Sequence, residues 1–328
     1  MSKNFKILLV GCGQLGSRHL QAVACLKEVR EIHVVDPNPQ SILLGKERLR
    51  TMSGVNRKIT FEWHAELNKV AAGGDLCIVA TQAKGRSELI QKIAERFIYK
   101  NFLIEKIVCP SIKEYQSLLL FQKQKKISIW VNCQTRTFDV HQYIKSCVNP
   151  SEPITFSAVG GNYGLACNGI HYADLFAFYT DADRIECSGS RIDPVLYPSK
   201  RGKDIWDLSG TLLGNSKNRS DFILSFSALD NDPDVVTIAT PHRRFMIDHL
   251  RKFAYECRAG SKWKKLIMQG DYFVSQTSQI LARDILVKGK CALPTLKECF
   301  PAHEFILKTL QPHFNRLLGV NRDYCPVT

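Results

Sequence analysis

A glycine-rich loop near the start of the chain constrains the fold more than any other feature. The loop at residues 11–16 reads Gly-Cys-Gly-Gln-Leu-Gly and follows residues 6–10, a short and almost continuously apolar stretch typical of a buried strand. After the loop, apolar residues recur at helical spacing as far as Leu26. A strand that passes through such a loop into a helix predicts the start of a parallel, doubly wound sheet.

The glycines of this loop have separate expected roles in binding a dinucleotide. Gly11 permits a tight turn, Gly13 lets the backbone approach a pyrophosphate, and Gly16 allows the helix to pack closely on the strand. The N-terminus of the helix offers N–H groups and the positive end of its dipole to the phosphates. We therefore expect the dinucleotide to be bound by the loop residues Gly11, Gly13, Gln14, Leu15 and Gly16.

An acidic residue at the end of the second predicted strand supports this expectation. Residues 32–35 lead directly into Asp36, about 20 residues beyond Gly16, where an acid binds the ribose hydroxyls. A carboxylate there repels a 2′-phosphate and no arginine follows it immediately, so we expect NAD rather than NADP. These residues alone leave open a nucleotide-free α/β domain, and a methyltransferase that uses a similar acid.

The hydrophobic pattern divides the chain of 328 residues into two predicted domains. Short apolar strands alternate with helices up to residue 131, which predicts an N-terminal Rossmann domain over residues 1–130 with a doubly wound parallel sheet. Longer, alternating strands such as residues 154–159 and 221–226 follow, which indicates a mostly antiparallel sheet. We expect residues 131–328 to form an α+β domain for substrate binding and oligomerisation, with a surface loop at 194–218. The fold class is α/β.

Charge and cysteine content limit the classes of partner. The net charge is +14, from 45 basic and 31 acidic residues, but the excess is dispersed, so we expect no nucleic-acid partner. Because no apolar run approaches the roughly 18 residues that span a bilayer, we expect no membrane partner and a cytoplasmic location. The 12 cysteines are scattered and form no C-x-x-C pair, which predicts free thiols and no metal site.

Further motifs follow the glycine loop and Asp36 in a characteristic order, and this order resembles the glucose–fructose oxidoreductase/inositol dehydrogenase (Gfo/Idh/MocA) family. The resemblance extends over essentially the whole chain. It rests on four segments: Ala80-Thr81, Glu105-Lys106, Asn132-Cys133-Gln134-Thr135-Arg136 and Gly169-Ile170-His171-Tyr172-Ala173-Asp174.

The resemblance implies a proton relay beside a nicotinamide. Lys106 follows a parallel strand, where it can stabilise a developing alkoxide, and His171 has a side chain suited to exchanging the hydroxyl proton. Asp174 shares a helical face with His171 and can orient its imidazole. We therefore expect Lys106, His171 and Asp174 to be catalytic. The same resemblance places Thr81, Glu105 and Lys106 at the cofactor.

This chain departs from the family's motifs at two positions. Ile107 stands where the family has the proline of E-K-P. Cys167 stands where many members have the first acid of D-x-G-x-H, and a thiol cannot replace a carboxylate at neutral pH. Residues 160–168 resemble a subfamily found with bacterial surface-polysaccharide genes. We expect substrate contacts from Arg136, Asn162, Tyr163, Cys167 and Asn168.

The leading hypothesis is an NAD(P)-dependent oxidoreductase that transfers a hydride to or from a sugar, sugar nucleotide or polyol. An anionic substrate fits the basic charge of the chain. The alternative is an NAD-binding regulatory or scaffold protein without turnover, since the usual acid is Cys167. The resemblance also implies a homo-oligomer, either a dimer or a tetramer.

Overall fold

The computed structural model describes residues 4–161, 164–199, 201–268 and 273–328. The contacts divide the chain into two units. Unit 1 contains residues 1–109, 115–132 and 271–296, and unit 2 contains residues 110–114, 133–270 and 297–328. This division differs from the boundary expected at residue 130 mainly in one segment, residues 271–296, which lies in unit 1.

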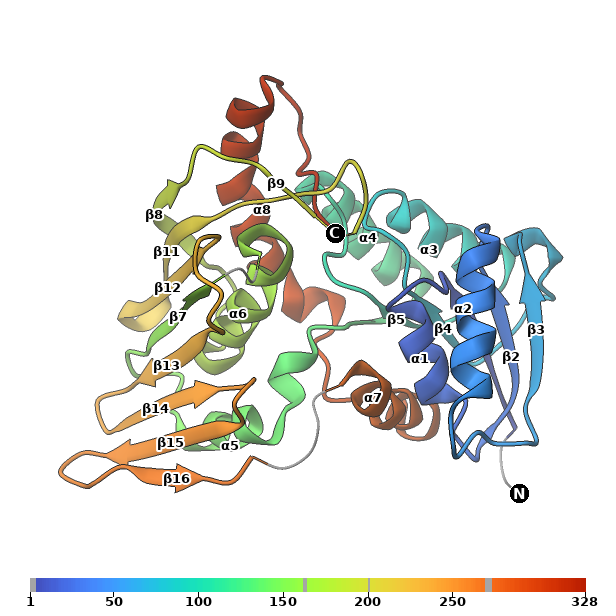
Figure 1. The fold of residues 1–328 in the computed structure, drawn as a ribbon, viewed down its shortest axis with the longest axis horizontal. Coiled ribbons are helices and arrows are strands. Elements are labelled where there is room, and N and C mark those ends of the chain that lie inside the picture. The colour runs from blue at the N-terminus through green and yellow to red at the C-terminus, as the bar shows by residue number, and fades with distance from the viewer. Residues whose placement is uncertain (1–3, 162–163, 200, 269–272) are drawn as a thin grey trace. The chain divides into compact units, whose positions relative to one another are not determined.

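Unit 1 is built on a six-stranded parallel sheet, as the alternating strands and helices predicted (Figure 1). The strand order is β3-β2-β1-β4-β5-β6, and the order reverses between β1 and β4. Ligands of such sheets bind beyond the carboxyl ends of the strands at this switch point. The strands are β1 (Phe5–Val10), β2 (Val29–Val35), β3 (Thr60–His64), β4 (Leu76–Val79), β5 (Asn101–Ile104) and β6 (Ser128–Val131).

Helices cover both faces of this sheet. One face carries α1 (Gly16–Val23), α2 (Pro39–Arg50) and α7 (Val274–Lys288), and the other carries α3 (Arg86–Arg96) and α4 (Ile112–Lys125) (Figure 1). The core beneath α1 and α7 is made of fully buried aliphatic side chains such as Ile7, Leu20, Ile32 and Leu281. The hydrophobic effect of this burial is what fixes the helices on the sheet.

Two elements of unit 1 went unrecognised in the sequence. Strand β3 lies at the edge of the sheet, and its half-exposed residues Thr-Phe-Glu-Trp-His lack the continuous apolar run of a central strand. Helix α2 begins at Pro39 after Asn38, whose side chain accepts a hydrogen bond from the backbone of Gln40. An Asn-Pro pair is typical of a turn as well as of a helix start, so it does not by itself predict the helix.

Unit 2 contains an eight-stranded sheet in the order β16-β15-β14-β13-β7-β12-β11-β8. Its strand pairs are antiparallel except β7 with β12, which confirms the expected mostly antiparallel sheet. The strands are β7 (Thr155–Gly161), β8 (Glu186–Ile192), β11 (Gly210–Ser216), β12 (Ser220–Ser227), β13 (Val235–Ala239), β14 (Arg243–Asp248), β15 (Phe253–Arg258) and β16 (Lys264–Leu266), with the separate pair β9 (Tyr197–Pro198) and β10 (Trp206–Asp207).

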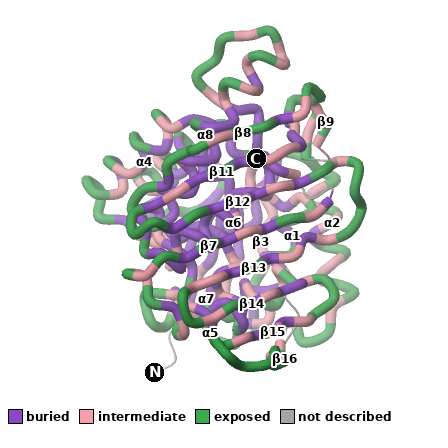
Figure 2. Tube along the Cα trace, turned by 90° about the vertical axis from the view of Figure 1, so that its left-hand side faces the viewer, coloured by how far each residue is buried: buried purple, intermediate pink, exposed green. Residues whose placement is uncertain are grey.

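One face of this sheet is covered and the other is open. Along β12 buried residues alternate with less buried ones, and Figure 2 shows this alternation along the neighbouring strands. Helix α6 (Leu165–Thr180) packs on β12, and unit 2 also contains α5 (Asp139–Cys147) and α8 (Leu296–Leu318). The helices of the described residues include none that is long and apolar enough to cross a membrane.

The expectation of a surface loop at residues 194–218 was wrong for much of that segment. It contains β9, β10 and the whole of β11, which pairs with β8 and β12 inside the sheet. At least one glycine of this segment is required by close packing inside the sheet. A Cβ at Gly214, for example, would lie 2.8 Å from the ring of Phe305.

Candidate active site

The glycine loop of unit 1 has the geometry that a dinucleotide requires. Gly11 has a φ of +88°, and a Cβ there would lie 2.8 Å from the carbonyl oxygen of Ala80. A Cβ at Gly16 would lie 1.9 Å from the carbonyl oxygen of Gly11, so the helix can approach the strand only with glycine. At Gly13 a Cβ would meet no described atom within 4 Å, which leaves this backbone open to a pyrophosphate.

The carboxylate of Asp36 lies against this loop. Its Oδ2 accepts a hydrogen bond of 2.7 Å from the backbone N–H of Cys12, and its Oδ1 accepts one of 2.8 Å from Asn38. The acid at the end of β2 therefore ties the loop to the second strand. The structure brings these two predicted parts of the cofactor site together.

Arg48 is a loop contact that the sequence analysis missed. Its guanidinium reaches from α2 to the carbonyl oxygen of Gln14 at 2.7 Å and to the side-chain oxygen of Gln14 at 2.6 Å. It also donates to the hydroxyl of Ser17 at 2.5 Å. A residue 34 positions away along the chain gives no local sequence signal, because α2 itself was not recognised.

Lys106 lies just beyond the carboxyl end of β5, in a segment held by a buried arginine. The guanidinium of Arg86 donates to the carbonyl oxygens of Glu105 at 2.5 Å and Val108 at 3.3 Å, and also to those of Ile107 and Thr81. Burial lowers the pKa of Arg86 to about 10, and the charge of Glu105 opposes this shift. The Lys106–Ile107 peptide bond is cis. Arg86 thus fixes the backbone that presents Lys106.

Glu105 occupies a buried hydrogen-bond network. Its Oε1 lies 2.7 Å from Nε2 of His19 and accepts a hydrogen bond of 2.7 Å from Asn132, while Nδ1 of His19 lies 2.9 Å from the hydroxyl of Ser278. Burial opposes ionisation, but His19 and Lys106 outweigh it and lower the pKa of Glu105. Glu105 was expected to contact the cofactor. In the structure its carboxylate is occupied by the hydrogen bonds with His19 and Asn132. Asn132 Oδ1 is buried and has no hydrogen-bond partner among the described residues.

In unit 2, the structure pairs two predicted site residues with each other. Asp174 on α6 is fully buried, and its carboxylate receives hydrogen bonds of 2.7 and 2.6 Å from Arg136. Burial raises the pKa of Asp174, whereas the Arg136 guanidinium opposes that shift. Arg136 was expected to contact substrate and Asp174 to orient His171. A bidentate buried pair of this kind favours a structural role for both.

The other predicted substrate residues lie at the start of α6. Cys167 is buried, with its sulfur 3.7 Å from the carbonyl oxygen of Trp206, and Asn168 accepts a hydrogen bond of 2.9 Å from Arg201. His171 is half-buried one helical turn further on. Asn162 and Tyr163 lie outside the described residues.

A cavity of about 280 Å³ opens beside this end of α6. Its lining includes Cys167, Asn168, Arg201 and a carboxylate that the sequence did not single out, Asp207 of β10. Burial raises the pKa of Asp207, and hydrogen bonds from the backbone of Leu208 and Ala166 oppose this shift. Because residues 194–218 were read as a loop, Asp207 gave no signal of a fixed position.

Asp207 lies close to Cys167, the position at which many members of the family have an acid. Its Oδ1 accepts hydrogen bonds of 2.7 Å from the backbone N–H of Ala166 and 3.4 Å from that of Cys167. Its Oδ2 lies against Gly164, where a Cβ would be only 2.3 Å away. A carboxylate is therefore present beside Cys167, although it comes from another strand.

Comparisons with solved structures show how widely this fold occurs. An oxidoreductase from Agrobacterium radiobacter, in complex with NAD+, L-tartaric acid and magnesium, has 14% identity and a TM-score of 0.71, covering 93% of this chain and 94% of its own. UDP-N-acetylglucosamine 3-dehydrogenase from Acidithiobacillus ferrooxidans has 13% identity and a TM-score of 0.71, covering 92% and 95%. A mutant 3-ketoreductase from Actinomadura kijaniata, with TDP-benzene and NADP, has 12% identity and a TM-score of 0.66, covering 93% and 96%.

The sequence itself gives a second, independent comparison. No curated protein matches the chain significantly. Residues 5–133 match the model of the oxidoreductase family with an NAD-binding Rossmann fold, GFO_IDH_MocA. This segment contains the glycine loop, Asp36 and Lys106. Residues 5–133 therefore belong to the Gfo/Idh/MocA oxidoreductase family as its NAD-binding Rossmann domain, which confirms the resemblance that the motif order predicted.

Proposed function

We propose that the protein transfers a hydride between NAD and a carbinol or carbonyl carbon of a sugar, sugar nucleotide or polyol. The observation that carries this proposal is the placement of Lys106 at the carboxyl end of β5, with its backbone held by the buried Arg86. Carboxyl ends of strands line the ligand crevice of such sheets. A cation fixed there is suited to an alkoxide that develops during hydride transfer.

The cofactor site supports NAD. The glycine loop leaves the backbone at Gly13 open, and Asp36 fixes this loop through Cys12. With NAD bound, the loop residues Gly11 to Gly16 would hold the pyrophosphate and Asp36 the ribose hydroxyls, while the nicotinamide would supply or accept the hydride. The negative charge of Asp36 disfavours the 2′-phosphate of NADP.

In the proposed relay, Lys106 and His171 handle the proton of the substrate hydroxyl. Lys106 stabilises the alkoxide, and the imidazole of His171 takes up or returns the proton. Asp174 is assigned to the buried pair with Arg136 rather than to the reaction. Many members of the family have an acid at the position of Cys167. With Asp174 in the buried pair, a carboxylate near the substrate would have to come from another residue.

We assign that carboxylate to Asp207. It lines the cavity beside Cys167 and Asn168, and Arg201 brings a cation to the same cavity. A carboxylate and an amide are suited to sugar hydroxyls, and a guanidinium is suited to an anionic group such as a phosphate. The cavity therefore fits a sugar-type substrate with a negative charge.

A test of the proposal compares two lysines of the same segment. Lys106→Ala is expected to lower kcat by roughly 100-fold or more with NAD and an active sugar, because the alkoxide loses its cation. Lys100→Ala, an exposed lysine directly before β5, is the matched control and should change kcat less than about twofold. The measurement is absorbance of the reduced nicotinamide, and undiminished turnover of Lys106→Ala would overturn the mechanism.

A second candidate is an NAD-binding protein without turnover, favoured by the burial of Asp174 in an ion pair. It predicts NAD binding by calorimetry but no reduced nicotinamide with any sugar. In either case we propose a homo-oligomer, a dimer or a tetramer. The open face of the eight-stranded sheet exposes apolar side chains such as Val159, which is 51% exposed, and Leu213, which is 40% exposed.

A further inference from the structure

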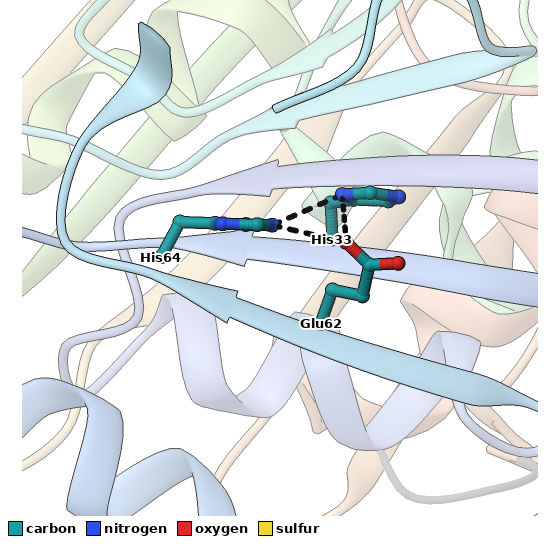
Figure 3. Close-up of side chains that lie close together, drawn as sticks. All are labelled: His33, Glu62 and His64. Carbon is teal, nitrogen blue, oxygen red and sulfur yellow. Dashed lines mark hydrogen bonds and ion pairs between the residues drawn. The ribbon is translucent and has the colours of Figure 1, made fainter. Parts of the chain in front are cut away.

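The edge of the six-stranded sheet carries a cluster of metal-ligating side chains that the proposed reaction does not use. His33 lies on β2, and Glu62 and His64 lie on the edge strand β3 (Figure 3). His33 is the register partner of Glu62, and His64 is two residues further along the same strand. Since side chains alternate along a strand, all three project from one face of the sheet.

The three ligand atoms form a triangle of the size that a zinc ion requires. Nδ1 of His33 lies 3.2 Å from Nε2 of His64, and Oε2 of Glu62 lies 3.4 Å from each of these nitrogens. Zinc bonds to nitrogen and oxygen are about 2.0–2.1 Å long, so tetrahedral ligand atoms lie roughly 3.3 Å apart. An ion can therefore bind all three atoms without a large movement of the backbone.

A second layer of contacts orients the inner histidine. Nε2 of His33 contacts the carboxylate of Glu31, which in turn lies 3.0 Å from Nζ of Lys6. A histidine that binds a metal usually donates its other ring N–H to a carboxylate, which fixes the tautomer. Here that contact leaves Nδ1 of His33 as the lone-pair donor, directed toward His64 and Glu62.

The three side chains of the cluster differ in their exposure to solvent. The side chain of His33 is 2% exposed, that of His64 is 15% exposed, and that of Glu62 is 47% exposed. An ion can therefore enter beside Glu62 and be held by an inner imidazole. The mixture of two imidazoles and one carboxylate suits zinc and similar transition ions better than magnesium or calcium, which prefer oxygen ligands alone.

A second cluster in unit 2 makes a useful contrast. Cys133, Asp174 and Cys299 also bring three ligand atoms together and are fully buried. Both carboxylate oxygens of Asp174, however, are bonded to the guanidinium of Arg136. A fixed cation beside the ligands repels a divalent ion, so this cluster is better explained as part of the core.

We propose that His33, Glu62 and His64 bind one divalent transition ion of the zinc class, with water completing a tetrahedral site. Without the ion, a proton between the two facing imidazole nitrogens makes their hydrogen bond. The ion replaces that proton and requires His64 to carry its hydrogen on Nδ1. Bound there, it ties the edge strand β3 to β2. The inference is independent of the proposed oxidoreductase activity.

The test uses full-length protein without a histidine tag, stripped with EDTA and titrated with zinc chloride. Wild type should bind one ion at this site, and His64→Asn and Glu62→Gln should each weaken binding at least tenfold. The matched control is His242→Asn, an exposed histidine whose Nε2 lies 3.9 Å from Glu152. Zinc should raise the melting temperature of wild type and of the control, and should leave that of both site variants nearly unchanged.

Cobalt substitution separates this site from the cysteines of the chain. Co²⁺ in the proposed site should give the visible bands of a tetrahedral ion without thiolate-to-metal charge transfer. Wild type that binds no ion would overturn the proposal. So would binding of equal affinity in wild type and both site variants, or a thiolate charge-transfer band in all three.

Discussion

At the scale of single residues, the proposed role of the candidate substrate site depends on the carboxylate of Asp207. Cys167 occupies the place of an acid, and Asp207 brings its carboxylate to the same end of α6 from β10. Asp207 also accepts the backbone N–H of Ala166, as a helix cap does. An asparagine keeps an oxygen for the cap and removes the negative charge, so the two roles can be separated.

The substitution Asp207→Asn is expected to lower kcat/KM for the sugar by roughly 10- to 100-fold, as the loss of a charged hydrogen bond predicts. The melting temperature should change little, because the cap is retained. Asp204→Asn, an exposed acid three residues earlier, is the control and should behave as wild type. If Asp207→Asn had a normal kcat/KM and a lowered melting temperature, Asp207 would act only as a helix cap, and its proposed role in substrate binding would be wrong.

The cofactor loop was predictable from sequence because its residues are neighbours along the chain. Gly11, Gly16 and Asp36 follow rules of local spacing, and the structure places them together. Asp207 and Arg48 were not predictable, since each reaches its partner from a distant element. The His33 cluster was missed for the same reason: its ligands are 31 residues apart and meet only through strand pairing.

At the scale of elements, α5, α6 and the turn after β14 meet at two histidines, of which His141 is buried and His249 half-buried. Nδ1 of His141 lies 2.5 Å from the hydroxyl of Tyr179, and its Nε2 lies 2.6 Å from Nε2 of His249. Burial lowers the pKa of His249 to about 4, with a smaller opposing effect of Asp248, and it also lowers the pKa of His141. Both rings are therefore neutral in the folded protein at neutral pH.

This junction predicts a loss of stability in mild acid. Between pH 6.5 and about 4 the unfolded chain binds protons at these histidines and the folded protein does not, so the free energy of unfolding falls as pH falls. His249 contributes about 2–3 kcal/mol to that fall. His249→Gln should flatten the dependence in urea melts at pH 7 and pH 5, whereas His242→Gln should not. Equal slopes in all three proteins would contradict the assignment.

Among the elements, strands that are buried on both faces were predicted well, whereas β3 and β11 were missed. Strands β1, β4, β5 and β6 are buried on both faces, so their sequences are short apolar runs. Strand β3 is covered on one face and carries charge on the other, and β11 contains two glycines, one of which, Gly214, lies against the ring of Phe305. Such positions depend on neighbours that a local pattern does not reveal.

At the scale of the whole molecule, unit 1 is not a continuous stretch of sequence. Helix α7 packs on α1, and its residues Leu281, Ala282 and Ile285 are almost completely buried in the core of unit 1. The next segment continues in the same unit, where the backbone N–H of Val131 donates to the carbonyl oxygen of Pro294 at 2.9 Å. Residues 273–296 are thus a structural part of the cofactor domain.

A fragment of residues 1–133 should therefore be less stable than the complete unit 1. Without Leu281 and Ile285 it loses about 1.5–3 kcal/mol for each large apolar side chain no longer buried. We expect strong binding of a hydrophobic dye and a broad thermal transition. The same fragment joined by a flexible linker to residues 273–296 should regain a cooperative transition, and a fragment of 1–133 as stable as that fusion would contradict this view.

Helix α7 belongs to unit 1 but follows most of unit 2 in the sequence, and this order affects folding during synthesis. A ribosome synthesises residues 1–133 before α7, and the helix that completes their core emerges only after residues 134–270 have been translated. The face of α1 that α7 covers therefore stays open while residues 134–270 are made. The NAD-binding domain therefore begins to form before residues 134–270 are made and is completed only once α7 has been made, so apolar surface of the nascent chain is exposed during that interval.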